Sequence, residues 1–140
     1  MNTKFLLLII LSILIGKTRF QFEADGELLE YEQDGVRITK LTENVQVFND
    51  SLSIETDQAY NYNELNKLFL YGNTKMISKT DTLTCDSMIY WLDKDSLFAF
   101  GNVQLTQAQQ KLNAQKLSFW ETDGYRGSSF IASKNVNIIG

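Results

Sequence analysis

The side chains best suited to catalysis in this chain are carboxylates. Asp86, Glu55, Asp93 and Asp95 are candidates for the acid pair that cleaves polysaccharides on some stacked β-scaffolds, where one group protonates the leaving oxygen and the other activates water or substrate. Asp93 and Asp95 share a strand parity, but the segment 93–95 has the composition of a solvated turn. The pattern stacks no two acids in one groove, so it predicts a protein that is not an enzyme.

Other reactive side chains are scarce. The sequence has no His, which removes imidazole catalysis and the commonest metal ligand. Its single Cys, Cys85, excludes an intramolecular disulfide and any paired-cysteine zinc or redox site. Because Cys85 lies in a segment of alternating polarity, we interpret it as a small buried apolar side chain. We therefore expect no cofactor, no metal site and no catalytic residue.

The elements that carry these side chains form a repeat. The segments 43–47, 72–76 and 101–105 resemble one another at a constant interval, and a weaker copy at 134–138 follows after a slightly longer one. The period of about 29 residues falls in the range that is typical of stacked supersecondary units sharing one core.

A second series keeps nearly the same interval. Tyr31, Tyr60, Tyr90 and Phe119 recur with this period, except that the step from Tyr60 to Tyr90 is longer by one position. On this alignment the copy that contains Tyr60 carries one residue more than the next, which is the tolerance expected of a β-bulge. Two series in phase indicate that the repeat is structural, and that function lies in the stacked surface.

Within each copy the polarity alternates with a period of two. Residues 97, 99, 101, 103 and 105 are predicted on one face of a strand, and Phe98, Phe100, Asn102 and Gln104 on the other. The alternation slips by one residue at 86–87 and at 115–116, which predicts a bulge or bend. No segment between residues 22 and 140 has a sustained helical period, so the sequence predicts an all-β fold. Phe98, Phe100 and Trp120 would face outward, where exposed aromatic rings can mark a partner surface.

The first residues are typical of a secretory leader. A short basic start precedes an apolar run of 11 residues, 5–15, that ends at Gly16-Lys17-Thr18-Arg19. As a helix this run would span only about 16 Å of a hydrocarbon core of about 30 Å. The expected organisation is a signal peptide over residues 1–21, cleaved loosely near Gln21, followed by one β-repeat domain over 22–140.

Charge excludes one class of partner. Removing residues 1–20 leaves 10 basic and 17 acidic side chains, a net charge of −7. Such a chain repels nucleic acid and anionic membranes, so we expect no nucleic-acid partner.

Stacking the copies aligns apolar side chains into inner columns. One column would contain Val45, Met76 or Thr74, Val103 and Val136, while Leu52, Leu83 and Leu112 would form another. The two arms of each rung would then close on one another with their apolar faces inside. The columns form either a packed core or the lining of a trough, and the spacing alone favours the core. The residues predicted to line a trough are Val45, Leu52, Leu70, Met76, Leu83, Cys85, Met88, Tyr90, Leu97, Ala99, Val103, Leu105, Leu112, Ala114, Leu117 and Phe119.

These motifs resemble a known family. The segments 85–90 and 97–103, with Leu112-x-Ala114-x-x-Leu117-x-Phe119, are similar to the repeat of the LptA/OstA family of periplasmic lipopolysaccharide-transport proteins. The likeness covers about residues 28–138. It implies a V-shaped β-jellyroll with open ends (a β-taco), whose apolar trough binds the acyl chains of lipid A. It also implies that such domains stack edge to edge, as homo-oligomers or with other proteins of the same fold, to bridge the periplasm to the outer membrane.

The chain departs from the family pattern at several positions. Glu43 and Lys134 replace Gly, Thr74 replaces Val, and the arm Asp is replaced by Glu55 and by Gln115 in two copies. Because the sequence ends in mid-rung at Gly140, it fits a short family member, a truncated product or the first part of a larger outer-membrane component. The short leader favours a soluble bridge over the membrane-anchored clamp of the same pathway. The remaining alternative is a structural or adhesive β-repeat domain with a filled core.

Overall fold

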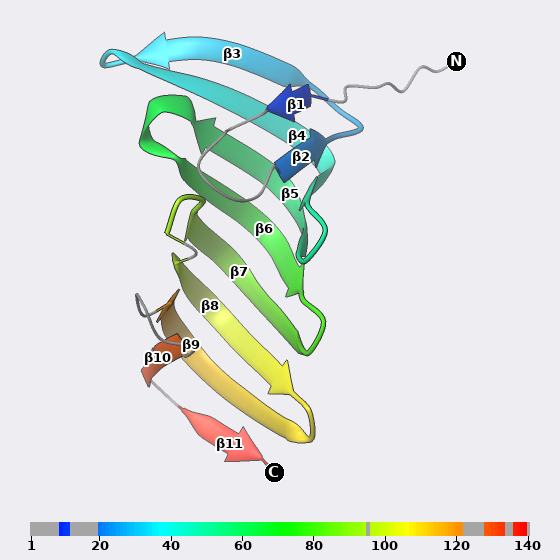
Figure 1. Cartoon of the computed structure of the whole chain (residues 1–140), viewed down its shortest axis with the longest axis vertical. Coiled ribbons are helices and arrows are strands. Elements are labelled where there is room, and N and C mark those ends of the chain that lie inside the picture. Colours follow the sequence, from blue (N-terminus) through cyan, green and yellow to red (C-terminus); the bar gives the residue numbers. More distant parts are fainter. Residues whose placement is uncertain (1–8, 12–19, 95, 122–127, 134–135, 140) are drawn as a thin grey trace.

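The fold is a single antiparallel sheet, shown in Figure 1, whose strands follow one another along the long axis of the molecule. This computed structural model describes residues 9–11, 20–94, 96–121, 128–133 and 136–139. The strands are β1 (Ile9–Leu11), β2 (Phe20–Glu23), β3 (Leu28–Gln33), β4 (Val36–Phe48), β5 (Ser53–Tyr62), β6 (Lys67–Ile77), β7 (Asp81–Trp91), β8 (Ser96–Gln107), β9 (Gln110–Glu121), β10 (Ser128–Ser133) and β11 (Asn137–Ile139). A short 3₁₀-helix, η1 (Asn63–Leu65), joins β5 to β6. The all-β prediction is confirmed.

The order in the sheet is that of a meander. From β4 to β9 each strand pairs with the next, while β2 and β3 both pair with β4 at one end and β10 and β11 both pair with β9 at the other. The hairpin between β3 and β4 turns through Asp34 and Gly35, with φ values of 53° and 81°. Positive φ at both central residues is the requirement of a tight type I′ turn, which an Asp-Gly pair satisfies.

Each long strand is interrupted near its middle by a register shift. The shifts fall between Thr42 and Val45, between Tyr71 and Thr74, and between Phe100 and Val103, with matching shifts in the strands between them. They align across the sheet and divide it into two arms. Arm A contains β2 and the segments 45–48, 53–56, 74–77, 81–84, 103–107 and 110–114. Arm B contains β3 and the segments 36–42, 58–62, 67–71, 87–91, 96–100 and 116–121.

The bend between the arms explains the repeated Gly-Asn pair. Gly72 and Asn73 have φ values of 89° and 44°, and Gly101 and Asn102 have 85° and 48°. This left-handed region is open to Gly and is tolerated by Asn. Glu43 and Asn44 adopt the same conformation in the first copy, at 68° and 49°. These residue pairs lie on β4, β6 and β8, so one repeat period corresponds to two strands. Each repeat then advances the sheet by about 9.5 Å.

An Asp carboxylate holds each Asn of the bend. The amide Nδ2 atoms of Asn73 and Asn102 donate to Asp57 and Asp86 at 2.9 and 3.0 Å, and Asn44 donates to Asp25 at 2.9 Å. The sequence interpretation placed Glu55 where Asp86 recurs in the preceding copy, and this was wrong. Asp57, which lies one repeat period before Asp86, takes that place because it faces the bend.

The core lies between the two arms. No second layer covers the sheet among the described residues, yet one of its faces is almost completely buried. The arms must therefore cover each other across the bend. Two predictions about the ends of the chain fall partly outside the described residues. The predicted leader includes described residues of β1 and β2, namely 9–11, Phe20 and Gln21, while 1–8 and 12–19 lie outside the described residues, so the cleavage site stays a prediction. The last repeat copy includes 134–135, which also lie outside the described residues.

Candidate functional site: an apolar trough

The narrow end of the trough is lined by small side chains. Val45, Thr56, Thr74, Cys85, Val103 and Ala114 follow one another across successive strands at the bend, and all are buried. Two arms that meet at a fold leave little space for side chains, which suits Ala, Cys, Thr and Val. The position left open between Met76 and Thr74 is therefore taken by Thr74.

The hydroxyl groups of Thr56 and Thr74 form a hydrogen bond with each other at the bend. Their hydroxyls lie 3.0 Å apart, and Thr56 Oγ1 also donates to the carbonyl of Gly72 at 3.1 Å. A buried hydroxyl needs such partners because an unpaired one costs about 1–3 kcal/mol. The other member expected in the column, Val136, is 44% exposed, so that expectation was wrong.

The predicted lining residues share one face. Fourteen of the sixteen are buried, and Leu52 and Phe119 are half-buried and packed against the same cluster. The inward orientation of these side chains follows from the register of the strands. Their burial is common to a packed core and to a lipid-binding trough, so lipid binding by these residues stays a prediction.

A cavity separates the arms over part of the trough. Its volume is about 170 Å³. Eight predicted residues line it: Leu52, Met76, Leu83, Tyr90, Leu97, Leu105, Leu117 and Phe119. They come from both arms, so the cavity lies between them. A cavity of about 150 Å³ with an apolar lining stays dry and binds benzene. This one therefore has room for a short stretch of hydrocarbon.

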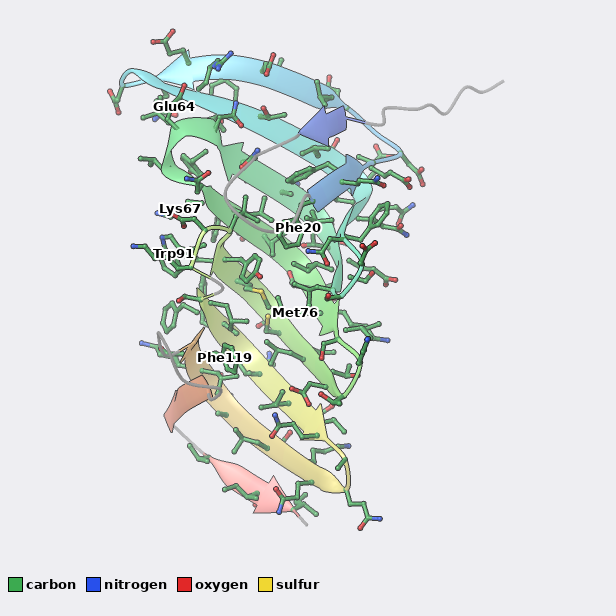
Figure 2. All side chains as sticks on the ribbon, in the orientation of Figure 1. Phe20, Glu64, Lys67, Met76, Trp91 and Phe119 are labelled. Carbon is green, nitrogen blue, oxygen red and sulfur yellow. The ribbon has the colours of Figure 1, made fainter. Side chains whose placement is uncertain are left out.

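The rest of the trough is filled by packing. Val45, Leu70 and Met88 have no exposed surface and do not line the cavity. Phe20 from β2 packs edge-on against Tyr90 of β7, with ring centroids 5.9 Å apart, and so joins the two arms. Figure 2 shows Phe20, Met76 and Phe119 following one another along the long axis of the molecule. The arms are thus in contact toward the N-terminal end and separated toward the C-terminal end.

One lip of the cavity is polar, and the sequence interpretation missed it. Ser78, Asp81 and Gln107 lie where the strands of arm A end. Gln107 Nε2 donates to Asp81 Oδ2 at 3.1 Å, and the Asp81 amide donates to Ser78 Oγ at 3.1 Å. These three residues do not recur at the repeat period, because they lie in or next to turns whose sequences differ between the copies. The lip can hydrogen-bond a polar group attached to an apolar chain.

Several apolar residues of the inner face were also missed. Leu41, Val47, Ile54 and Leu68 are buried, and each lies one repeat period before a predicted lining residue. The strict period would have found them. Phe22, which pairs with Val47, has no counterpart in the repeat.

The tyrosine series was misaligned by one residue. Tyr90 and Phe119 face inward and pair with Leu97, whereas Tyr60 pairs with Phe69 on the outer face. The inward position in that copy belongs to Asn61, which lies one repeat period before Tyr90 and is 1% exposed. The extra residue inferred for this copy is therefore absent. A shift of one residue reverses the face of a strand position, which is why Tyr60 misled the alignment.

The described carboxylates among those considered for catalysis do not meet in a groove. Asp86 holds the amide of Asn102 on the outside of the bend, Glu55 is exposed on arm A, and Asp93 is exposed in the turn after β7. Asp95 lies outside the described residues. Cys85 is buried, and burial, with a smaller effect of the neighbouring Asp86 charge, raises the pKa of its thiol to about 12. Within the described part of the chain no group of His, Cys, Asp and Glu could hold a metal ion.

The comparisons with known proteins support the fold. No family model matches the sequence, and no curated protein matches it. The structure is similar to the crystal structure of LptH, the LptA-homologous periplasmic component of the conserved lipopolysaccharide transport device from Pseudomonas aeruginosa. The TM-score is 0.66 with 10% sequence identity, over 86% of this chain and 93% of LptH. The LptA-like fold implied by the repeat motifs is thereby supported.

Proposed function

We propose that this protein is a periplasmic lipopolysaccharide-transport component that shields acyl chains of lipid A in its trough. The observation that carries the proposal is the apolar cavity between the arms, lined by eight of the residues that the sequence predicted. Each methylene withdrawn from water contributes about 0.8 kcal/mol, so a cavity of this lining favours a hydrocarbon chain over any polar ligand. The similarity in fold to LptH supports the same reading.

The cavity holds only part of an acyl chain. Its volume of about 170 Å³ is close to that of a site for one benzene ring. A longer chain would continue along the trough by displacing side chains that now join the arms, of which Phe20 and Tyr90 form the contact nearest the N-terminal end. The polar lip at Ser78, Asp81 and Gln107 would then face the sugar head of the lipid.

The ends of the sheet suit stacking with other domains of the same fold. Apolar side chains are exposed at the C-terminal end, where Ile138 and Ile139 of β11 are 66% and 52% exposed. Unpaired strand edges are templates for another strand. A concentration-dependent increase in mass in sedimentation velocity would support stacking, whereas a monomer at every concentration would contradict it.

The placement in the periplasm depends on the leader. Among the described residues no helix is both long and apolar enough to cross a membrane. The secretory pattern at residues 5–19 supports export.

Photo-crosslinking in a Gram-negative envelope tests the proposal. A crosslinking residue at Met76 would lie in the cavity, while one at Lys75 would project from the opposite face of the same strand. We expect lipopolysaccharide adducts at Met76 and at Phe119, and none at Lys75. Because Met76 is buried and Lys75 is exposed, circular dichroism must first establish that both variants are folded and expressed equally.

A filled core is the competing outcome. The fully buried residues Val45, Leu70 and Met88 favour it for the part of the trough where the arms touch. If a folded protein gives no adduct at Met76 or Phe119, the domain is structural or adhesive. Equal labelling at Met76 and Lys75 would place any lipid contact outside the trough.

A further inference from the structure

The two outer faces of the sheet differ in composition. On arm A the outward side chains are mostly polar, as in Thr82, Thr84 and Gln104. On arm B many of them are aromatic. Four of the chain's six tyrosines face outward there: Tyr31, Tyr60, Tyr62 and Tyr71. A solvated sheet face is expected to resemble arm A, so the aromatic face of arm B requires another explanation.

Charge on the outer face of arm B has one sign. On the strands of arm B from β3 to residue 119, the outward side chains include Lys40, Lys67 and Lys116. None of these outward side chains is Asp or Glu. The chain as a whole has 17 acidic and 13 basic residues, so this segregation runs against its net charge. Carboxylates lie at both borders of this face: Asp57 and Asp86 at the bend accept hydrogen bonds from Asn73 and Asn102, and Glu64 of η1 forms an ion pair with Arg37.

The rings of this face form two groups, one on each side of β7. Tyr60 contacts Phe69 at 6.2 Å between centroids, and Phe69 contacts Tyr71 at 6.0 Å. Phe98 and Phe100 on β8 are 5.5 Å apart. The outward orientation predicted for Phe98 and Phe100 agrees with their register, while the side chain of Trp120 lies outside the described part of the structure. Ile89 of β7 lies between the two groups, since it pairs with Phe69 and with Phe98. Aromatic and aliphatic side chains thus extend from β5 to β8, roughly 14 Å across the strands.

The lysines lie beside the rings. Lys40 Nζ is 5.6 Å from the ring centroid of Tyr60, and Lys67 Nζ is 5.6 Å from that of Tyr62. Figure 2 shows Lys67 and Trp91 at one edge of the sheet, where their strand positions pair. Tyr71 is 54% exposed and Leu29, also outward on arm B, is 49% exposed. Cationic groups are thus held at the level of a partly exposed aromatic surface.

We propose that the outer face of arm B docks on the surface of an anionic lipid bilayer. Tyr and Trp are the side chains enriched at the membrane interface, where their rings lie among the headgroups and their polar tips stay hydrated. Lysines at the same level are attracted by anionic headgroups. The absence of acidic side chains among the described outward residues of this face removes the repulsion that the rest of the chain would experience. This docking does not depend on whether the trough binds lipid.

The lysines argue against a protein partner on this face. A protein surface that covered the rings would remove the lysines from water, and each would then need a matching carboxylate. A bilayer presents fluid anionic groups that can move to each lysine. An anionic polysaccharide could also place charges near the lysines while its sugar rings cover the aromatic ones, and the experiment must separate it from the bilayer.

Vesicle co-sedimentation with matched charge variants tests the proposal. The mature protein is mixed with vesicles of pure phosphatidylcholine or of phosphatidylcholine with phosphatidylglycerol. The test variant is K40Q/K67Q/K116Q. The control, K75Q/K79Q/K111Q, changes the net charge equally but on arm A and its turn, where all three lysines are exposed. Circular dichroism establishes that both variants are folded.

We expect the wild-type protein to sediment with the anionic vesicles only, and less as salt is added. One lysine near an anionic surface changes affinity by about fivefold, so the test variant should lose about 100-fold and the control less than about fivefold. Tyr71→Ser should also weaken binding without changing the salt dependence.

Three results would overturn the proposal. The first is a wild-type protein that does not sediment with anionic vesicles. The second is an equal loss of binding in the two triple variants, which would mean that net charge rather than the arm B face is responsible. The third is binding to heparin, used as a soluble anionic polysaccharide, with no binding to vesicles, which would assign the face to a glycan.

Discussion

Replacing Gly101 by Ala tests the account of the bend that shapes the trough. Gly101 has φ of 85°, where a side chain costs about 1–2 kcal/mol. An added Cβ would also lie 2.8 Å from the Cβ of Asp86. Asp86 would have to move and lose its hydrogen bond with Asn102, at a further cost of about 1 kcal/mol. We expect the free energy of unfolding to fall by about 2–3 kcal/mol in total.

Gly35→Ala is the matched control. Gly35 has φ of 81°, but an added Cβ there would meet no atom within 4 Å. This variant should lose only the backbone part, about 1–2 kcal/mol. The difference between the two variants isolates the contact with Asp86.

Urea unfolding measures both losses. With a slope of about 1–3 kcal/mol per molar, Gly101→Ala should lower the midpoint by at least about 0.7 M. In the Asp86→Gly background the same change should cost less, because the Cβ that it would meet is gone. Equal losses in Gly35→Ala and Gly101→Ala, or the same loss with and without Asp86, would refute the reasoning.

Three further variants or conditions test other parts of the structure. Glu43→Gly should raise the free energy of unfolding by about 1 kcal/mol, since Glu43 has φ of 68° and Gly removes that strain; no gain in urea would contradict it. Asn61→Leu should stabilise the fold by about 1 kcal/mol, because the buried Asn61 Oδ1 accepts no hydrogen bond from any described residue; a lower melting temperature would count against this. Because Cys85 keeps its proton up to a pKa of about 12 when folded, against 9.0 ordinarily, stability should be complete below pH 9 and fall above it by about 1.4 kcal/mol per pH unit. Urea titrations at pH 8 to 11 measure this, and in Cys85→Ala the slope should decrease.

The residues of the inner face show how much of the trough could be predicted from the sequence repeat. All sixteen predicted lining residues lie inside the fold because the alternation of a strand fixes which side chains share a face. The repeat period also implied Leu41 and Ile54, which were not included. The error at Tyr60 came from matching residue type rather than spacing, and the inward residue is Asn61.

The sequence by itself determined the strands, the face of most apolar residues and the position of the bends, because alternation and Gly-Asn pairs are local properties of the chain. Only the tertiary structure decided how the arms close. The contact of Phe20 with Tyr90 and the cavity that ends at Phe119 depend on residues far apart in sequence. The separation of lysines from carboxylates on arm B likewise follows from strand register, which places residues of several strands on one surface. Local patterns contain no information on such distances, and so they could not distinguish a filled core from a trough.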